Sequence, residues 1–215
     1  MNVADLVEDR DIENVVHFTT NHGLCGALAE GRLLSRARLP ETKYLEHVYR
    51  PNASVRKDRE WLDYVNLSIS RLNWEFFDHS QRWHADTDVW WCAVALDPML
   101  LSFDGVVFTT TNNIYTSCRR ATGGIGLEAL FADTVARWPG NVAKRDPRLP
   151  RNWTTCHQAE VLVPREVPME LLRRIYVATE LHADIAASQC EILLGSTENT
   201  PPIEVDPDAF ERSPV

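Results

Sequence analysis

The chain has 215 residues, of which 44% are hydrophobic, and a formal net charge of −9 at pH 7. This length is enough to bury the core of one domain. The acidic balance argues against an ordinary nucleic-acid binder, because phosphate contacts need lysine and arginine. Basic residues nevertheless collect between Arg32 and Arg59 and between Arg119 and Arg151. They allow a locally positive groove, although scattered arginines and lysines usually form ordinary solvated faces.

The sequence carries no sign of a membrane or secreted protein. No apolar run reaches the roughly 18 residues that a membrane span needs, and the acidic N-terminus lacks the basic and apolar regions of a signal peptide. We therefore predict a cytoplasmic protein that has no membrane contact. The five cysteines are scattered and form no C-x-x-C pair, so the pattern indicates buried free thiols and predicts no metal.

The first third of the chain predicts a strand, a helix, a long loop and a second strand. Residues 11–19 contain β-formers and predict the first strand. Residues 22–34 predict the helix, with Gly31 as its C-cap. Polar and basic residues with two prolines predict a long loop over 36–60, and loops of this length are often functional. Alternation over 63–70 predicts a half-buried strand.

The middle of the chain predicts two strands and one amphipathic helix. The apolar run 89–97 is typical of a central strand, and Pro98 ends it. Residues 106–110 predict another short strand. The helical spacing of apolar residues is clearest over 125–138, which predicts one amphipathic helix. Residues 141–155 predict a second basic loop.

The last part of the chain continues the alternation of short strands and helices. Strands are predicted over 159–164 and 174–179, with a short helix from Pro168 to about Arg173 between them. A further helix is predicted over 182–190.

Taken together, the elements predict an α+β fold of short strands and few helices. We expect a single domain over 1–215, with a core at about 11–194 and an irregular, proline-containing tail over 195–215. No internal repeat or low-complexity tract divides the chain.

Three side chains could carry chemistry. His17, in the run His17-Phe18-Thr19 at the end of the first strand, could hydrogen-bond a ribose hydroxyl, although a single strand histidine is more often structural. Glu160 begins an otherwise apolar strand, where desolvation demands a partner or a function, unless the side chain points to water. Arg71 follows a strand and could clamp a phosphate bidentately or lie on the surface.

A single carboxylate such as Glu160 suits chemistry at a positively charged sugar carbon. It can hold the 2′-hydroxyl of the nicotinamide ribose and stabilise positive charge at C1′ as nicotinamide leaves. It can also help to deprotonate an incoming nucleophile.

Other functional patterns are incomplete. No G-x-G-x-x-G follows a strand, and the glycine-rich run 123–126 lacks the lysine of a P-loop. Cys156-His157 could form a thiol nucleophile, but nothing in the sequence indicates an activated thiol. No zinc-deaminase pattern occurs. Trp74 and Trp83 fall in stretches with loop-like composition, where they could stack on bases or belong to the core.

Four blocks, in this order, resemble the DarT family, the toxin halves of DarT–DarG toxin–antitoxin pairs. HFTTNHGLCGALAEGRLLS is similar to the family's opening His-Phe/Ile-Thr block, and DYVNLSIS to its Asp-Tyr-Val strand. VVFTTTNNIYTS resembles its Phe-x-x-x-Asn block, and QAEVLVPREVP resembles its Ala-Glu-hydrophobic-Leu-Val-Pro block. The resemblance spans roughly residues 14–180. The first and last blocks together are specific to the family, whereas each block alone is not.

The resemblance implies an ADP-ribosyltransferase fold related to the poly-ADP-ribose polymerases. It further implies transfer of ADP-ribose from NAD to a base in single-stranded DNA, and a macrodomain antitoxin of the DarG type that removes the mark. Glu160 takes the place of the catalytic glutamate. The positions that the resemblance assigns to NAD contacts are His17, Phe18, Thr19, Gly26 and Leu34.

One departure from the family pattern concerns the catalytic arginine. In many members the Tyr-Val strand continues into an aromatic stretch and Asn-Pro-Arg, whereas here the text is VNLSISRLN. Arg71 is the nearest arginine, displaced by one residue, and becomes the candidate. Such a departure is compatible with a branch that has another target base, so the resemblance implies thymine or guanine as acceptor. The basic loops at 36–60 and 141–151 would then flank the cleft and guide the strand.

Three alternatives stay open at this point. The chain could transfer ADP-ribose to RNA or protein, it could be a non-catalytic nucleic-acid-binding module of the same fold, or it could be an interaction protein that needs only a partner.

Overall fold

The computed structural model describes residues 1–39, 59–84, 89–195 and 200–212. Its α-helices are α1 (Val3–Asp9), α2 (Asn21–Glu30), α4 (Trp74–Trp83), α5 (Gly123–Ala129) and α6 (Glu180–Leu194). Short 3-10 helices cover Arg36–Arg38, Arg59–Trp61, Pro98–Ser102, Met169–Leu171 and Pro207–Phe210. Most of the loop predicted over 36–60 lies outside the described residues.

The strands form one large sheet and two small ones. The large sheet contains β1 (Val15–Thr20), β3 (Tyr64–Ile69), β4 (Trp91–Leu96), β5 (Val107–Thr109), β6 (Arg120–Thr122), β9 (Glu160–Pro164), β11 (Leu172–Val177) and β12 (Ile203–Val205). Its order is β12-β11-β4-β1-β3-β9-β5-β6. The small sheets pair β2 (Arg32–Leu34) with β10 (Glu166–Pro168), and β7 (Thr134–Trp138) with β8 (Asn141–Lys144).

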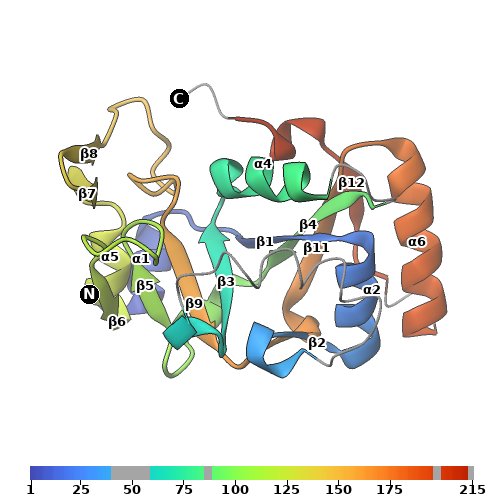
Figure 1. The fold of residues 1–215 in the computed structure, drawn as a ribbon. Helices are drawn as coiled ribbons and strands as arrows, with labels where there is room; N and C mark the ends of the chain where they lie inside the picture. Colours follow the sequence, from blue (N-terminus) through green and yellow to red (C-terminus); the bar gives the residue numbers. More distant parts are fainter. Residues whose placement is uncertain (40–58, 85–88, 196–199, 213–215) are drawn as a thin grey trace.

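The sheet runs through the molecule with helices on both sides (Figure 1). The larger core cluster joins the sheet to α1, α2, α5 and α6, and α2 packs against α6 at one end. A smaller cluster around Val16 and Ala93 lies on other positions of the same strands, and the aromatic rings of Phe18 and Phe77 pack beside it at 5.2 Å. The predicted α+β class is confirmed.

The central strands appear where the apolar runs predicted them. β3 alternates between buried and half-buried positions, as expected for residues 63–70, whereas β4 and β9 are buried at nearly every position. Continuous burial requires cover on both faces of a strand. The strong local signals of these segments therefore agree with their central places in the sheet.

The first predicted helix is confirmed, but it is shorter than expected. α2 begins at the N-cap Thr20, whose hydroxyl accepts from the Gly23 N–H, and ends at Gly31 with φ 66°. Gly31 thus occupies the left-handed C-cap position that the sequence assigned to it. The prediction of helix up to residue 34 was wrong, because the next three residues form β2 and pair with β10.

The single amphipathic helix predicted over 125–138 was wrong. α5 ends at Ala129, and the segment Thr134–Trp138 is strand β7, which pairs with β8. Gly140, with φ 80°, forms the turn of this hairpin rather than the end of a helix. The apolar residues Leu127, Leu130 and Phe131 do face the core. Their spacing resembled one helix because two short elements, each with buried residues, follow each other directly.

The second basic loop and the short helix after it also differ from the prediction. Residues 141–155 begin with β8, which is half of the hairpin, before the chain becomes irregular. The helix predicted from Pro168 to Arg173 is reduced to the 3-10 turn Met169–Leu171, because β11 already starts at Leu172 and pairs with β4.

The tail predicted as irregular contributes to the fold. Ile203–Val205 forms β12, which pairs in parallel with β11, and Phe210 packs against Phe77 at 5.6 Å between ring centroids. The edge of β11 has backbone N–H and C=O groups that need hydrogen-bond partners, and the tail supplies these partners as β12. Two helices, α1 and α4, were not predicted, and α4 places Trp74 and Trp83 in a helix rather than in loops.

Candidate active site

Glu160 is a buried carboxylate with two oriented donors. Its side chain lies at the first position of β9 and is 7% exposed. Oε1 accepts a hydrogen bond from Asn66 Nδ2 at 3.1 Å, and Oε2 accepts one from the backbone N–H of Asn113 at 2.8 Å. The reading in which Glu160 points to water was therefore wrong. Hydrogen bonds to a charged group are among the stronger ones in proteins.

The surroundings of Glu160 hold its donors in place. Thr109, its register partner on β5, hydrogen-bonds both the N–H and the carbonyl oxygen of Glu160 at 3.2 Å. Arg120 donates from Nε to Asn113 Oδ1 at 2.6 Å and from Nη1 to the carbonyl of Cys118 at 3.1 Å. The loop that supplies the Asn113 N–H is thus fixed by a guanidinium on β6, and the carboxylate is preorganised before any ligand binds.

His17 is a neutral imidazole with a defined tautomer. Its Nδ1 lies 2.9 Å from the carbonyl oxygen of Asn66. A carbonyl can only accept, so Nδ1 carries the proton and Nε2 is an acceptor. Desolvation lowers the pKa of His17 below its ordinary value of 6.5, and the bond to Asn66 only partly opposes this effect. At pH 7 the ring is therefore uncharged.

Asn66 connects the two residues that the sequence singled out. Its side chain binds Glu160 and its backbone carbonyl binds His17. The connection is possible because β1 and β9 both neighbour β3, and because the ladder between β1 and β3 ends at the pair Val16–Ser68. The sequence gave no signal for Asn66 beyond a polar position in an alternating strand.

The other residues assigned to NAD contacts lie on β1, α2 and β2. Phe18 belongs to an aromatic cluster with Phe77 and Trp91, at 5.2 and 5.8 Å. Thr19 is 9% exposed, and its carbonyl faces the thiol of Cys92.

Gly26 and Leu34 lie farther along the same N-terminal segment. A Cβ added to Gly26 would meet no atom within 4 Å. Leu34 ends β2 opposite Glu166 on β10.

Arg71 is a half-buried cation, separated from the end of β3 by Ser70. The backbone turns at Ser70, which has φ 61°, and the Arg71 guanidinium lies over the ring of Trp153 at 4.3 Å. Its Nη2 donates to the carbonyl of Thr154 at a long 3.5 Å, and Nε has no hydrogen-bond partner among the described residues. Desolvation lowers the pKa of Arg71 to about 10, so it remains charged at pH 7 and suits an anionic ligand.

A second polar cluster lies beside Arg71 and was not recognised in the sequence. Glu75, on α4, has Oε1 3.2 Å from His157 Nε2, and its Oε2 accepts from Arg137 Nη2 at 3.2 Å and from the Gln158 side-chain amide. The ring of Trp74 stacks on His157 at 5.3 Å.

The structure gives no sign of an activated thiol at Cys156. The thiol of Cys156 is buried and donates to Thr111 Oγ1 at 3.3 Å, which is the environment of a structural cysteine. In the ranges that the structure covers, no three His, Cys, Asp or Glu side chains are grouped so that they could hold a metal ion. No helix in those ranges has the length and apolar character to cross a membrane.

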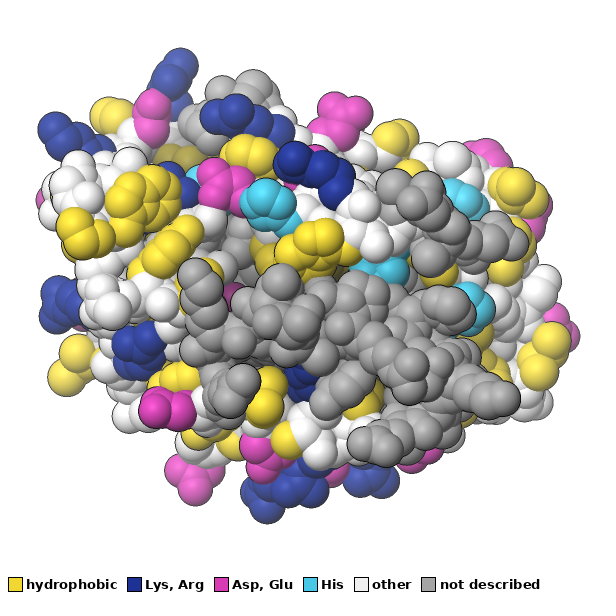
Figure 2. Space-filling model, viewed as in Figure 1, with side chains coloured by type: hydrophobic (Ala, Val, Ile, Leu, Met, Phe, Trp, Pro, Cys, Tyr) yellow, Lys and Arg dark blue, Asp and Glu magenta, His cyan; other side chains and the backbone are white. Residues whose placement is uncertain are grey.

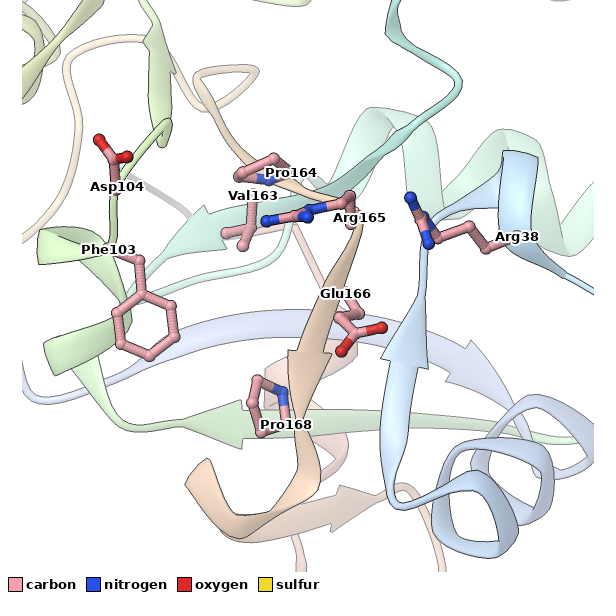
Figure 3. A pocket seen from close by; sticks show the side chains of 8 residues that line it. All are labelled: Arg38, Phe103, Asp104, Val163, Pro164, Arg165, Glu166 and Pro168. Carbon is pink, nitrogen blue, oxygen red and sulfur yellow. The ribbon is translucent and has the colours of Figure 1, made fainter.

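A separate cavity of about 570 Å³ lies near the far end of β9 (Figure 3). Its walls include Arg165 and Phe103, and Arg38 and Glu166 flank it. Both flanking charges are already paired, Arg38 with Asp63 at 2.9 Å and Glu166 with Arg32 at 3.1 Å. This cavity does not contain Glu160.

The surface above the cluster carries cationic side chains. In Figure 2, Lys and Arg side chains lie along the upper edge of the face, from the region of β8 towards that of α4, with Asp and Glu side chains among them. This distribution agrees with the expectation of a locally positive surface on an acidic chain.

The comparisons with known proteins decide the family. The sequence model of a family described as "ssDNA thymidine ADP-ribosyltransferase, DarT" matches residues 16–211. The chain belongs to the DarT family.

Solved structures of DarT proteins share the fold. Thermus sp. 2.9 DarT in complex with NAD+ is 17% identical, with a TM-score of 0.62 over 94% of this chain and 98% of that one. The same protein in complex with ADP-ribosylated ssDNA is 17% identical, with a TM-score of 0.61 over 94% and 97%. Thermosipho africanus DarTG in complex with ADP-ribose is 14% identical, with a TM-score of 0.53 over 92% of this chain and 51% of that one. No protein with a curated description matches the sequence.

Membership of the DarT family confirms the resemblance stated from the four sequence blocks. The structure places two of these blocks together, because His17 and Glu160 both contact Asn66 in the Asp-Tyr-Val strand. It also places the displaced Arg71 at the end of that strand, beside the segment that leads into Glu160.

Proposed function

We propose that this chain transfers ADP-ribose from NAD+ to a thymine base in single-stranded DNA, and that Glu160 is the carboxylate on which transfer depends. The observation that carries the proposal is a buried carboxylate with two fixed N–H donors, next to an uncharged imidazole. The family description and the NAD+ and ADP-ribosylated ssDNA complexes of Thermus DarT support it.

The residues present fit NAD+ as co-substrate, which supplies a ribose C1′ with nicotinamide as its leaving group. A carboxylate has about four acceptor positions, so Glu160 can accept from a ribose 2′-hydroxyl while Asn66 and Asn113 hold it. His17 offers Nε2 as an acceptor for a second hydroxyl, because Nδ1 is engaged by Asn66. Arg71 Nε has no hydrogen-bond partner in the part of the chain that the structure describes, and the guanidinium can pair with a phosphate.

The family resemblance supports additional NAD contacts on β1, α2 and β2. The proposed positions are Phe18, Thr19, Gly26 and Leu34.

Glu160 contributes mainly electrostatic stabilisation. A buried negative charge beside C1′ stabilises the positive charge that develops there when nicotinamide leaves, and it costs no reorganisation because its donors are already placed. A single-stranded substrate avoids the free-energy cost of unpairing a base, which is roughly a few kcal/mol. Arg71 and the cationic upper edge in Figure 2 provide charges for the DNA backbone.

The chain is proposed to be the toxin of a toxin–antitoxin pair that acts in the cytoplasm, where bacteria keep both NAD+ and DNA. Its partner is then a macrodomain antitoxin of the DarG type, and no membrane is involved. Family membership and the similarity to a DarTG chain solved with ADP-ribose support this assignment. Removal of the mark from a modified oligonucleotide by a DarG-type macrodomain tests it.

The deciding experiment is mass spectrometry of single-stranded oligonucleotides of mixed sequence after incubation with NAD+. The wild type should add one ADP-ribose, and fragmentation should place it on thymine rather than guanine. Glu160→Gln keeps the size of the side chain and removes its charge, so transfer should fall by about 10²- to 10³-fold or more. Glu166→Gln, a change at an ion-paired glutamate of β10, is the matched control and should remain active.

Parallel arms with RNA and protein distinguish the alternatives. Transfer to RNA or protein but not to DNA would replace the proposed substrate. DNA binding without NAD+ turnover would indicate the non-catalytic module, and full activity of Glu160→Gln would remove the catalytic assignment.

A further inference from the structure

Transfer to thymine requires a proton acceptor. N1 of the base is occupied by the deoxyribose, and the other ring nitrogen, N3, carries a hydrogen, so bond formation at N3 must release a proton. We propose that His157, held by Glu75, is the general base that accepts this proton. The inference rests on the proposed function and adds a catalytic residue to it.

Glu75 is fixed so that one carboxylate oxygen serves His157. Its Oε2 is held by Arg137 and by the amide of Gln158. Arg137 Nη2 also donates to Gln158 Oε1 at 2.9 Å, which sets the orientation of that amide. Oε1 lies 3.2 Å from His157 Nε2, which is within ion-pair distance, although Nε2 makes no hydrogen bond of regular geometry among the described residues. Three elements, α4, β7 and the segment before β9, therefore meet around this carboxylate.

This arrangement selects the tautomer that a base needs. A carboxylate beside Nε2 favours the proton on that nitrogen, so Nδ1 is left as the proton acceptor. The stacked ring of Trp74, at 5.3 Å and 27°, fixes the plane of the imidazole. A base oriented by a carboxylate is the general logic of catalytic His–Asp and His–Glu pairs.

The charges around His157 are balanced for proton transfer near neutral pH. Desolvation lowers the pKa of His157 below 6.5, the carboxylate of Glu75 opposes this effect, and the cations Arg137 and Arg71 add to it. Arg212 also lies at the cluster, over the Trp74 ring at 4.7 Å. The ring is therefore uncharged at pH 7, and Glu75 stabilises the imidazolium once a proton arrives.

The position of His157 matches the rest of the candidate site. His157 lies three residues before Glu160 in the chain, so the Cα atoms of the two residues can be at most about 11 Å apart. Arg71 lies near His157, whose pKa it influences, and contacts Thr154 on the segment that leads into Glu160. For the proposed step, the N3 edge of the base must lie between the imidazole and C1′, within hydrogen-bond reach of His157 Nδ1.

The proposed step is balanced. The N3–H proton moves to His157 Nδ1, the N3 electron pair forms the bond to C1′, and nicotinamide leaves with the electrons of its bond to C1′. No oxidant, reductant or metal is required.

The test compares His157→Gln with wild type, using thymine oligonucleotides and oligonucleotides that carry 5-bromouracil instead. Bromine is similar in size to the methyl group and makes N3–H more acidic, which lessens the need for a base. His157→Gln should lower kcat with thymine by about 10²- to 10⁴-fold with little change in the KM for NAD+. The ratio of 5-bromouracil to thymine rates should rise at least tenfold in this variant. The fall of kcat below pH 6.5 should become shallower, and His17 is the second site group that is protonated in that range.

Two further variants keep the result interpretable. Glu75→Gln retains the shape of the cluster and should lower kcat less than His157→Gln, with the same direction of the 5-bromouracil effect. His79→Gln changes an exposed histidine of α4 and should behave as wild type. Thermal unfolding of each variant separates loss of the fold from loss of the base.

The outcomes separate this inference from the proposed function. If the wild type modifies no DNA, the proposed function fails together with it. If the wild type modifies thymine and His157→Gln does so at the same rate, with the same pH profile and the same 5-bromouracil ratio, only the assignment of His157 is overturned.

Discussion

Removing the side chain of Asn66 tests whether Glu160 needs its oriented donor. Asn66→Ala deletes the Nδ2–H that reaches Glu160 Oε1 at 3.1 Å, while the backbone carbonyl that holds His17 remains. A hydrogen bond to a charged group contributes about 1.5–3 kcal/mol. If the bond acts fully in the transition state, kcat/KM should fall by about 10- to 150-fold. The lower part of this range is expected, because the Asn113 N–H still holds Oε2.

The assay is the initial rate of DNA modification at saturating oligonucleotide with varied NAD+. Asn66→Asp should be worse than Asn66→Ala, since it places a second carboxylate against Glu160. Asn2→Ala removes the N-cap of α1 and provides a control for a loss of stability of about 1 kcal/mol away from the site. A folded Asn66→Ala enzyme with kcat/KM within twofold of wild type would refute the reasoning.

Three other predictions follow from single contacts. Gly126→Ala should lower the free energy of unfolding by about 1–3 kcal/mol or more, because a Cβ there would lie 2.3 Å from a backbone oxygen. Gly26→Ala lies at an open position of a helix and should raise the free energy of unfolding by about 0.5–1 kcal/mol. Equal melting temperatures for the two variants would contradict this prediction. The pKa of His17 is lowered in the folded state, so as pH falls below 6.5 the unfolded chain binds a proton at this residue that the folded chain does not bind. The stability that is present above pH 6.5 should therefore be lost as pH falls, by at most about 1.4 kcal/mol per pH unit for this group. Urea unfolding measured between pH 5 and 7 should show that the free energy of unfolding falls less steeply with pH in His17→Gln than in wild type. An unchanged slope of this free energy against pH would disprove the prediction. Arg71→Lys keeps the charge but loses the planar stack on Trp153, so transfer should fall by about tenfold or more while the fold persists; wild-type rates in a direct DNA-modification assay would count against a role for the guanidinium.

The strands around the site could be predicted because their signals are local. The alternation in 63–70 and the apolar run before Pro98 each specify a strand within a few residues, and Gly31 marks a helix end by its own backbone preference. Glu160 also stood out locally, as a carboxylate at the start of an apolar strand. Its burial was decided by the structure, because the sequence also allowed a side chain that points to water.

The failures occurred where a neighbour in space decided the structure. The spacing over 125–138 fits one helix, but its second half pairs with β8 and becomes a strand. The tail carries little strand signal of its own, and Ile203–Val205 is strand because β11 has an open edge. Local propensity is a weak prior that such contacts override.

The family resemblance singled out His17 and Glu160 as site residues, whereas the sequence by itself determined the α+β class and the central strands. The class and the strands depend on periodicity, which can be read within a short window. Only the tertiary structure decided that Asn66 connects the two site residues, and that Glu75 and His157 form a pair beside Arg71. Hydrogen bonds between distant parts of the chain require atoms to lie about 3 Å apart, and only the packed sheet with its helices fixes such distances.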